Sequence, residues 1–180
     1  MKATGIVRRI DDLGRVVIPK EIRRTMRIRE GDPLEIYTSR DGEVIFKKYS
    51  LLGGVEDFAA ELCETMSRST GSVCAVTDRD TVIAVAGGGK RELLGKLITA
   101  ELEQIMEGRR IYHYAGDGKT LPVCDGNDKL TTAVAAPILA EGDLLGLVLF
   151  ISTEGAAATG DAEYKLAQTI AAFLGRHMES

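Results

Sequence analysis

Apolar and polar residues alternate with a period of two along much of the first fifty positions, which is the pattern of strands. Two such runs are separated by Asp11-Asp12-Leu13-Gly14, which has the composition of a turn. Two further runs flank Ser39-Arg40-Asp41-Gly42, and Asp-Gly between alternating runs is a strong hairpin signal. The predicted strands cover residues 6–10, 15–18, 34–37 and 44–47.

A short helix is predicted between the second and third of these strands. Pro19 suits the first turn of a helix, where its missing N–H costs nothing, and residues 20–26 follow at helical spacing. Gly31-Asp32-Pro33 ends this helix. A β-β-α-β-β unit of this size buries too little surface to be stable alone, and it lacks disulfide or metal staples. We therefore expect this first domain to be a dimer in which each chain completes the other's core.

The pattern changes after Leu51-Leu52-Gly53-Gly54, and we place a domain boundary between residues 53 and 54. The second domain is predicted to open with a helix over 56–69 and to close with a helix over 161–178. Between them the pattern predicts one helix through residues 93–106 and strands over 72–78, 81–86, 111–114, 132–139 and 144–152. The chain is thus predicted to be α+β with two domains, the second an α/β sandwich of the sensor type.

The closing helix carries an apolar arc too wide for a helix that lies singly on a sheet. In one interpretation, the arc and the apolar stripe of the opening helix pack against a second copy as a four-helix bundle. Dimers through both domains would then give a homotetramer. The alternative is a deeply buried helix in a monomeric domain. The residues concerned are Phe58, Leu62, Met66, Leu166, Ile170, Phe173 and Leu174.

The overall net charge of −4 conceals an uneven distribution. Residues 1–50 hold 12 Lys and Arg against 8 Asp and Glu, a net charge of +4, whereas the remaining 130 residues carry −8. The first 29 residues alone carry +6. A basic domain attached to an acidic one predicts a polyanion as the partner of the basic domain.

Other features exclude several classes of protein. No apolar run approaches the ~18 residues that a membrane span needs, and the N-terminus lacks the apolar segment of a secretory signal. Cys63, Cys74 and Cys124 are odd in number and widely spaced, which favours free thiols in a reducing compartment. We expect a cytoplasmic protein with no metal, no cofactor and no catalytic residues.

The first domain resembles the AbrB family of bacterial transition-state regulators. The resemblance is carried by the run from Thr4 to Pro19 (TGIVRRIDDLGRVVIP), by Glu21-Ile22-Arg23-Arg24, and by Gly31-Asp32-Pro33-Leu34-Glu35-Ile36-Tyr37 with Lys47-Lys48-Tyr49. It implies a swapped-hairpin dimer of the double-psi-like barrel type that binds double-stranded DNA. The layout of the whole chain resembles regulators that carry a C-terminal GAF domain, which implies a sporulation context, association with the nucleoid and a small-molecule effector of unknown identity.

The resemblance also assigns residues to the DNA. Arginines at the motif positions of Arg8, Arg15, Arg23 and Arg24 contact DNA in the family, and the planar guanidinium suits both phosphates and guanine edges. By charge alone, further phosphate contacts are predicted at Arg9, Lys20 and Arg27. The alternative is that this basic run is only a solvated surface. Neither a helix-turn-helix, a zinc finger nor an aromatic RNA-binding stripe competes with this interpretation.

Two other functions stay open at this point. Swapped-hairpin domains also occur in antitoxins, although those usually append a short disordered tail. Some GAF proteins are thiol-dependent sulfoxide reductases, and Cys124, in a polar loop, is the one cysteine expected to be exposed enough to react. Gly87-Gly88-Gly89-Lys90 is not followed by Ser or Thr as a phosphate loop requires, so a strand-to-helix turn near the GAF ligand pocket is the favoured interpretation.

Overall fold

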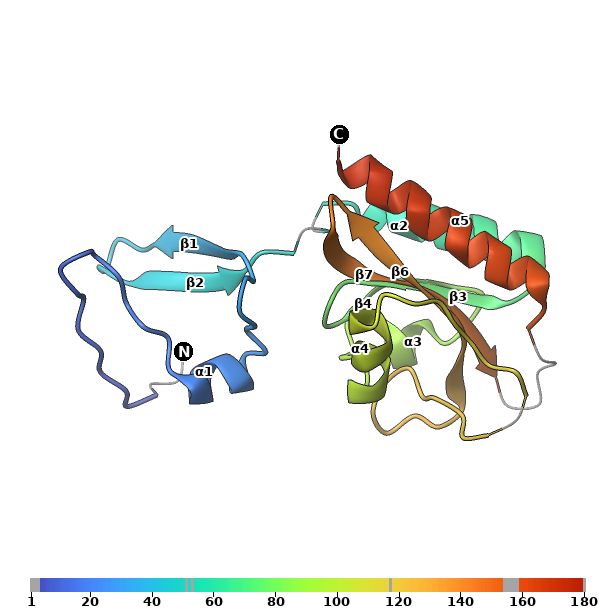
Figure 1. Cartoon of the computed structure of the whole chain (residues 1–180), viewed down its shortest axis with the longest axis horizontal. Coiled ribbons are helices and arrows are strands. Elements are labelled where there is room, and N and C mark those ends of the chain that lie inside the picture. The colour runs from blue at the N-terminus through green and yellow to red at the C-terminus, as the bar shows by residue number, and fades with distance from the viewer. Residues whose placement is uncertain (1–3, 51, 53, 117, 154–158, 180) are drawn as a thin grey trace. The chain divides into compact units, whose positions relative to one another are not determined.

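The structure is a computed structural model that describes residues 4–50, 52, 54–116, 118–153 and 159–179. The chain divides into two compact units, Met1–Tyr49 and Ser50–Ser180, which we call the head and the body (Figure 1). The side chain of Leu52 is only 1% exposed and packs in the core of the body, so residues just before the expected boundary already belong structurally to the body. That residues 1–53 act as the independent domain stays a prediction.

The described residues of the head form one helix and one hairpin. Helix α1 (Lys20–Thr25) follows Pro19, whose carbonyl accepts a hydrogen bond from the N–H of Arg23 at 2.9 Å. Strands β1 (Leu34–Thr38) and β2 (Val44–Lys48) pair antiparallel. Gly42, in the turn between them, has φ +79°, a left-handed conformation that glycine adopts at little cost. The predicted helix and hairpin are confirmed.

Residues 6–10 and 15–18 form no strand within the single chain. Between them the turn is as predicted, since the N–H of Asp11 donates to the carbonyl of Arg15 at 3.1 Å and that of Gly14 to the carbonyl of Asp11 at 3.0 Å. A strand needs a neighbour to bond with, and the pair β1–β2 does not serve as that neighbour here. The two strands expected from the alternating pattern are therefore absent from the described part of an isolated chain.

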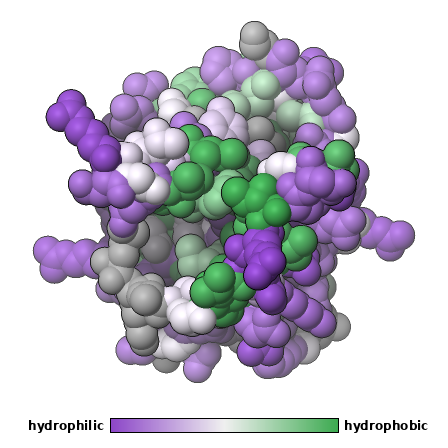
Figure 2. All heavy atoms as spheres, turned by 90° about the vertical axis from the view of Figure 1, so that its left-hand side faces the viewer, coloured by the Kyte–Doolittle hydropathy of each residue, from purple (hydrophilic) through white to green (hydrophobic). Residues whose placement is uncertain are grey.

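The head buries little of its apolar surface. Among its described residues only Pro19 is buried. Figure 2 views the head and shows apolar side chains gathered around a hollow, bordered by hydrophilic ones. The large apolar residues of the head that are exposed are Ile6, Val7, Ile10, Leu13, Val16, Val17, Met26, Ile36, Tyr37, Val44, Phe46 and Tyr49.

The body is built on one antiparallel sheet with the strand order β4-β3-β7-β6-β5 (Figure 1). Its strands are β3 (Val73–Thr77), β4 (Val82–Ala86), β5 (Tyr112–His113), β6 (Leu130–Ala140) and β7 (Asp143–Thr153). Glu141 and Gly142 both have positive φ in the tight turn between β6 and β7, the longest pair of the sheet. Every strand predicted for the body is present, with shifted ends.

Helices cover both faces of this sheet (Figure 1). Helices α2 (Glu56–Thr70) and α5 (Asp161–Met178) lie on one face, and α3 (Lys90–Leu93) and α4 (Ala100–Glu107) lie on the other. The single helix predicted through residues 93–106 is wrong. Gly95 has φ +73° and the N–H of Ile98 donates to the carbonyl of Asp80 at 2.9 Å, so this segment leaves the helix to reach the β3–β4 turn. Among the described residues, no helix is long and apolar enough to cross a bilayer.

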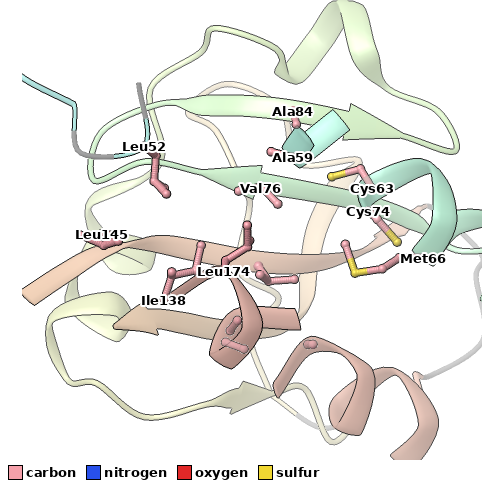
Figure 3. Packing of buried hydrophobic residues seen from close by; sticks show 14 of the residues in the cluster. Leu52, Ala59, Cys63, Met66, Cys74, Val76, Ala84, Ile138, Leu145 and Leu174 are labelled. Atoms are coloured by element: carbon pink, nitrogen blue, oxygen red, sulfur yellow. The ribbon is translucent and has the colours of Figure 1, made fainter. Parts of the chain in front are cut away.

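Two apolar layers, one on each face of the sheet, form the core of the body. Figure 3 shows the layer under α2 and α5, where Met66 and Leu174 point toward the sheet. Leu174 is 0% exposed, so it belongs to the core of a single body and not to the outer face of its helix. Gly146 and Gly175 let neighbouring backbones approach closely. A Cβ at Gly146 would overlap the carbonyl of Thr77, and a Cβ at Gly175 would overlap the carbonyl of Leu139.

Candidate nucleic-acid interface

The turn at residues 11–15 is organised by the carboxylate of Asp11. Its Oδ1 accepts the backbone N–H groups of Leu13 at 3.0 Å and of Arg15 at 2.7 Å, and its Oδ2 accepts Nε–H of Arg15 at 2.8 Å. The hydrogen bond from the backbone of Arg15, then that from its side chain, lowers the pKa of Asp11 below its usual value. Asp11 therefore stays ionised and fixes both the turn and the base of the Arg15 side chain.

Helix α1 exposes its positively charged side chains to solvent. None of its residues is buried, and Lys20, Arg23 and Arg24 are exposed. The hydroxyl of Thr25 donates to the carbonyl of Glu21 at 2.8 Å and Met26 ends the helix. Because Arg23 and Arg24 are adjacent in a single helical turn, their guanidinium groups leave the helix on neighbouring sides.

The predicted contact residues fall into two groups by their surroundings. Arg8, Arg9, Lys20, Arg23 and Arg24 are exposed, and within the described part of the chain no acceptor engages their side chains. Arg15 is also exposed but forms the ion pair with Asp11. Arg8 and Arg15 lie on the two extended segments that the 11–15 turn joins. Six of the seven predicted contact residues are thus accessible to a polyanion.

Arg27, the seventh residue, has different surroundings. It is half-buried with φ +51°, its carbonyl accepts a hydrogen bond from Nζ of Lys48 at 2.8 Å, and its Nη1 is buried without a described partner. Nζ of Lys48 also lies 3.5 Å from Oδ2 of Asp32, a side chain only 3% exposed. The N–H of Arg29 donates to the same oxygen at 2.8 Å. These bonds tie the chain after α1 to β2, and a phosphate contact by Arg27 stays a prediction.

Sequence reasoning missed Asp11, Asp32 and Lys48 as functional neighbours. An acidic residue four positions before an arginine, across a turn that ends in glycine, was the available signal for Asp11. Asp32 was assigned only to the end of a helix, and its burial beside Lys48 depends on the fold. Local sequence could not have shown that pairing, because the two residues lie on different elements.

The body shows no catalytic arrangement among its described residues. No group of three or more His, Cys, Asp or Glu side chains is placed to hold a metal ion within the described ranges. The expectation that Cys124 is exposed is wrong: it is 4% exposed, in the apolar layer beneath α3 and α4. Burial raises the pKa of all three thiols, to about 12 for Cys63 and Cys74. A protonated, buried thiol is a poor nucleophile.

The glycine triplet is a packing feature. A Cβ at Gly87 would overlap Oγ of Ser67, and one at Gly89 would lie 2.9 Å from a methyl group of Leu130. The face of the sheet beneath α3 and α4 is filled by apolar side chains. A groove of about 410 Å³ lies instead beside α5, lined among others by Arg109, Arg176 and Pro137.

The profile of the family described as "Stage V sporulation protein T C-terminal, transcription factor" matches residues 54–179. Stage V sporulation protein T of Bacillus subtilis (strain 168) is 49% identical over 180 residues, 99% of each chain. The chain belongs to the stage V sporulation protein T family. The expected resemblance is confirmed, and membership in a family of transcription factors supports the expectation that the chain is not an enzyme.

The head has relatives of its own. The transition state regulatory protein AbrB of Bacillus subtilis (strain 168) is 63% identical over 49 residues, which are 27% of this chain and 50% of that protein. The profile described as "Antidote-toxin recognition MazE, bacterial antitoxin" matches residues 7–50. The head is therefore similar in sequence to both transition-state regulators and antitoxins, whereas the match of the body is to the transcription-factor family.

Solved structures similar to the body carry GAF domains. The PixJ GAF domain of Thermosynechococcus elongatus matches with a TM-score of 0.56 at 15% identity, covering 73% of this chain and 89% of that one. A GAF domain/HD domain protein of Geobacter sulfurreducens matches with a TM-score of 0.51 at 15% identity, covering 71% and 93%. At this level of identity the likeness shows the fold alone, and it confirms the predicted GAF-like sandwich.

Proposed function

We propose that this protein is a sequence-specific, DNA-binding transcription regulator that grips DNA through a dimer of its heads. The observation that carries the proposal is a set of exposed cations on the 11–15 turn and on α1, in a domain closely related to AbrB. Arg8, Arg15, Arg23 and Arg24 are the proposed DNA contacts, with Arg9 and Lys20 on the phosphates. Among the described residues only Arg15 of these four has an internal ion pair, so the others can meet a polyanion without giving up such a partner.

The proposed head dimer is supported by how little one head buries. Twelve large apolar side chains of the head are exposed, and Pro19 is the one buried residue of its described part. The extended segments around the 11–15 turn also have unpaired backbone groups that a second chain can bond. If two heads intertwined, the exposed apolar side chains would become buried and these backbone groups would become paired. We propose that each chain contributes its 4–18 hairpin to its partner's sheet.

The body is proposed to form a second dimer contact, which makes the whole protein a tetramer. Phe173, on α5, is 48% exposed and its ring lies 6.0 Å from that of Phe58 on α2. The ring of His177 lies 4.8 Å from that of Phe58. This aromatic group spans the two helices and offers a partner body a continuous apolar contact, as in a four-helix bundle.

Sensing of a small molecule by the body is also part of this proposal. The groove beside α5 is lined by Arg109, Arg176 and Glu179 together with apolar side chains, and we take it as the site for a small polar organic molecule. Action on the nucleoid in the cytoplasm follows from the proposed partner. The sporulation role is carried over from the related protein of Bacillus subtilis.

The salt dependence of DNA binding tests the central proposal. Full-length protein is used to select duplexes from a random-sequence pool, and affinity for a selected duplex is measured from 50 to 200 mM salt. If the eight proposed arginines of a dimer mostly meet phosphates, affinity should fall by roughly 10³–10⁵-fold. Arg23→Ala and Arg24→Ala should weaken binding without changing the melting temperature. Arg40→Ala, which removes an exposed arginine on the β1–β2 turn, is the matched control.

Two results would contradict the proposal. If no duplex is enriched in the selection at 50 mM salt, the protein is not a sequence-specific DNA binder. If Arg40→Ala weakens binding as much as Arg23→Ala, attraction depends on total charge and not on the proposed surface.

A further inference from the structure

Arg15 is held differently from the other exposed arginines of the head. Its Nε donates to Oδ2 of Asp11 at 2.8 Å, while Oδ1 of the same carboxylate accepts its backbone N–H at 2.7 Å. Asp11, a residue of the same turn, therefore holds both the backbone and the side chain of Arg15. No described acceptor restrains Arg8, Arg23 or Arg24 in this way.

This arrangement leaves one defined part of the guanidinium available. A guanidinium has five N–H groups in a planar fork. Because Nε is engaged by Asp11, the two Nη groups at the end of Arg15 remain for a ligand. A pair of parallel donors of this kind matches O6 and N7 of guanine in the major groove. Holding the fork in advance also reduces the rotamer entropy that binding would cost.

The charge of Asp11 influences which acceptor Arg15 prefers. Its carboxylate lies against Arg15 and accepts three hydrogen bonds, so it remains negative near the DNA. A phosphate that approaches Arg15 meets this second anion, and the like charges repel one another. The edge of a guanine carries no net charge and avoids that repulsion. The ion pair itself is solvent-exposed and contributes little to stability, so its effect is on geometry and selectivity.

We infer that Asp11 is a positioning residue that makes Arg15 a base-reading arginine, aimed at a guanine edge in the major groove. Arg8, Arg23 and Arg24, whose side chains no described carboxylate holds in this way, mainly contact phosphates. This inference rests on the proposed function, since it assumes that the head binds duplex DNA with sequence preference.

The first experiment replaces Asp11 by Asn in the full-length protein. Asn keeps an oxygen that can accept the backbone N–H groups of the turn but loses the negative charge. Affinity is measured for the selected duplex and for poly(dA·dT) as the non-specific probe. Asp12→Asn is the matched control, because Asp12 is an exposed carboxylate of the same turn without a described side-chain partner.

Asp11→Asn should weaken binding to the selected duplex by roughly five- to a hundredfold, the range for one bidentate base contact. Binding to poly(dA·dT) should stay the same or strengthen, because a negative charge is gone. Asp12→Asn should leave the ratio of the two affinities unchanged. If Asp11→Asn strengthens binding to both probes, Arg15 is a phosphate contact and the inference is wrong. If it weakens both equally, Asp11 is only structural and the inference is also wrong.

A second experiment does not depend on the folding of the Asp11 variant. Guanines of the selected duplex are replaced one at a time by 7-deazaguanine, which lacks the N7 acceptor but still pairs with cytosine. One such position should weaken binding of the unmodified protein and have no effect on binding of Arg15→Ala, because alanine offers the guanine edge no donor. If no position behaves in this way, Arg15 does not read a guanine. The proposed function itself fails only if the selection yields no preferred duplex at all.

Discussion

Pro19 is the only described residue of the head that is buried as a whole, whereas the body buries an apolar layer on each face of its sheet. Both units obey the same local rules: each has turns at glycine and an antiparallel hairpin. They differ in their cores: in the body a single chain supplies all the layers that pack together, whereas in the head it does not. The body's long pair β6–β7 lies between two layers of helices, whereas the described residues of the head form no second sheet to pack on the β1–β2 hairpin. Local structure is thus separable from the formation of a core.

Among the variants that test this difference between the head and the body, Gly146→Ala in the body should cause the largest loss of stability. A Cβ there would overlap the carbonyl of Thr77, so strands β3 and β7 would have to separate. We expect a loss of about 3 kcal/mol or more in the free energy of unfolding and a drop of about 10 °C in the melting temperature. Gly160→Ala is the control, because the nearest atom to its Cβ would be a carboxylate oxygen of Glu163 at 3.6 Å. Calorimetry showing equal transitions for both variants would mean that the body's core is loosely packed.

The head should respond at its interface and not in its own core. Val16 is 46% exposed in one chain, so Val16→Asp would be tolerated by an isolated head but would bury a charge in a head dimer. We expect the dissociation constant of the head contact to rise at least about a hundredfold while the body's melting transition is unchanged. Sedimentation of the full-length variant measures this, with Thr38→Asp, at an exposed position of β1, as control. A Val16→Asp variant with the parent's mass would break the contrast between the two units.

The same idea predicts that residues 1–53 expressed alone form a folded dimer. One head buries too little surface to fold as a monomer. Light scattering together with circular dichroism tests this, and a folded monomer would refute it. The fragment should bind DNA more weakly than the full chain, because the body holds a second pair of heads at high effective concentration.

Two neighbouring residues of α5 separate core from interface within the body. Leu174 is 0% exposed and Phe173 is 48% exposed. Leu174→Glu should therefore abolish the body's folding transition, whereas Phe173→Glu should leave it and reduce the assembly from tetramer to dimer. Sedimentation and thermal melting of the full chain distinguish the two, with Gln168→Glu, exposed on another side of α5, as control. If the Phe173→Glu variant still forms tetramers, the aromatic group of α2 and α5 is not the contact between bodies.

The smallest effect concerns the thiols. Burial raises the pKa of Cys63 and Cys74 from 9.0 to about 12, so the folded body favours the neutral thiols. Their contribution to stability is fully present below pH 9 and is lost as the pH rises from 9 to 12, because the unfolded chain ionises first. At pH 8 a disulfide reagent should therefore label the native protein slowly, and in urea it should label all three cysteines. Rapid labelling of native Cys124 would restore the redox alternative.

Much of the molecule could be predicted from sequence because the signals were local. The hairpin at Asp41-Gly42, the turn at residues 11–15 and the strands of the body each follow from turn chemistry and short-range periodicity. The uneven charge and the motif from Thr4 to Pro19 predicted a regulator of the AbrB type, which the comparisons support. The contacts assigned to the individual arginines remain predictions.

Where prediction failed, a contact between distant segments had overruled the local pattern. Apolar spacing favoured one helix through Leu97 and Ile98, but the bond from Ile98 to Asp80 draws this segment to another element. Cys124 lies in a polar stretch of sequence and is nevertheless buried, since the N–H of Thr99 holds the carbonyl of Val123 at 3.1 Å beneath α4.

By itself, therefore, the sequence determined the strands and outer helices of the body, the hairpin and helix of the head, the turns, and the uneven charge of the two units. Only the tertiary structure decided that Leu174 is core while Phe173 is exposed, that Arg27 is half-buried while Arg23 is exposed, and that Arg15 is anchored by Asp11. The physical reason is range: hydrogen bonds within a turn and periodic burial depend on residues a few positions apart. Burial and the partners of charged groups depend on which distant surfaces the folded chain brings together.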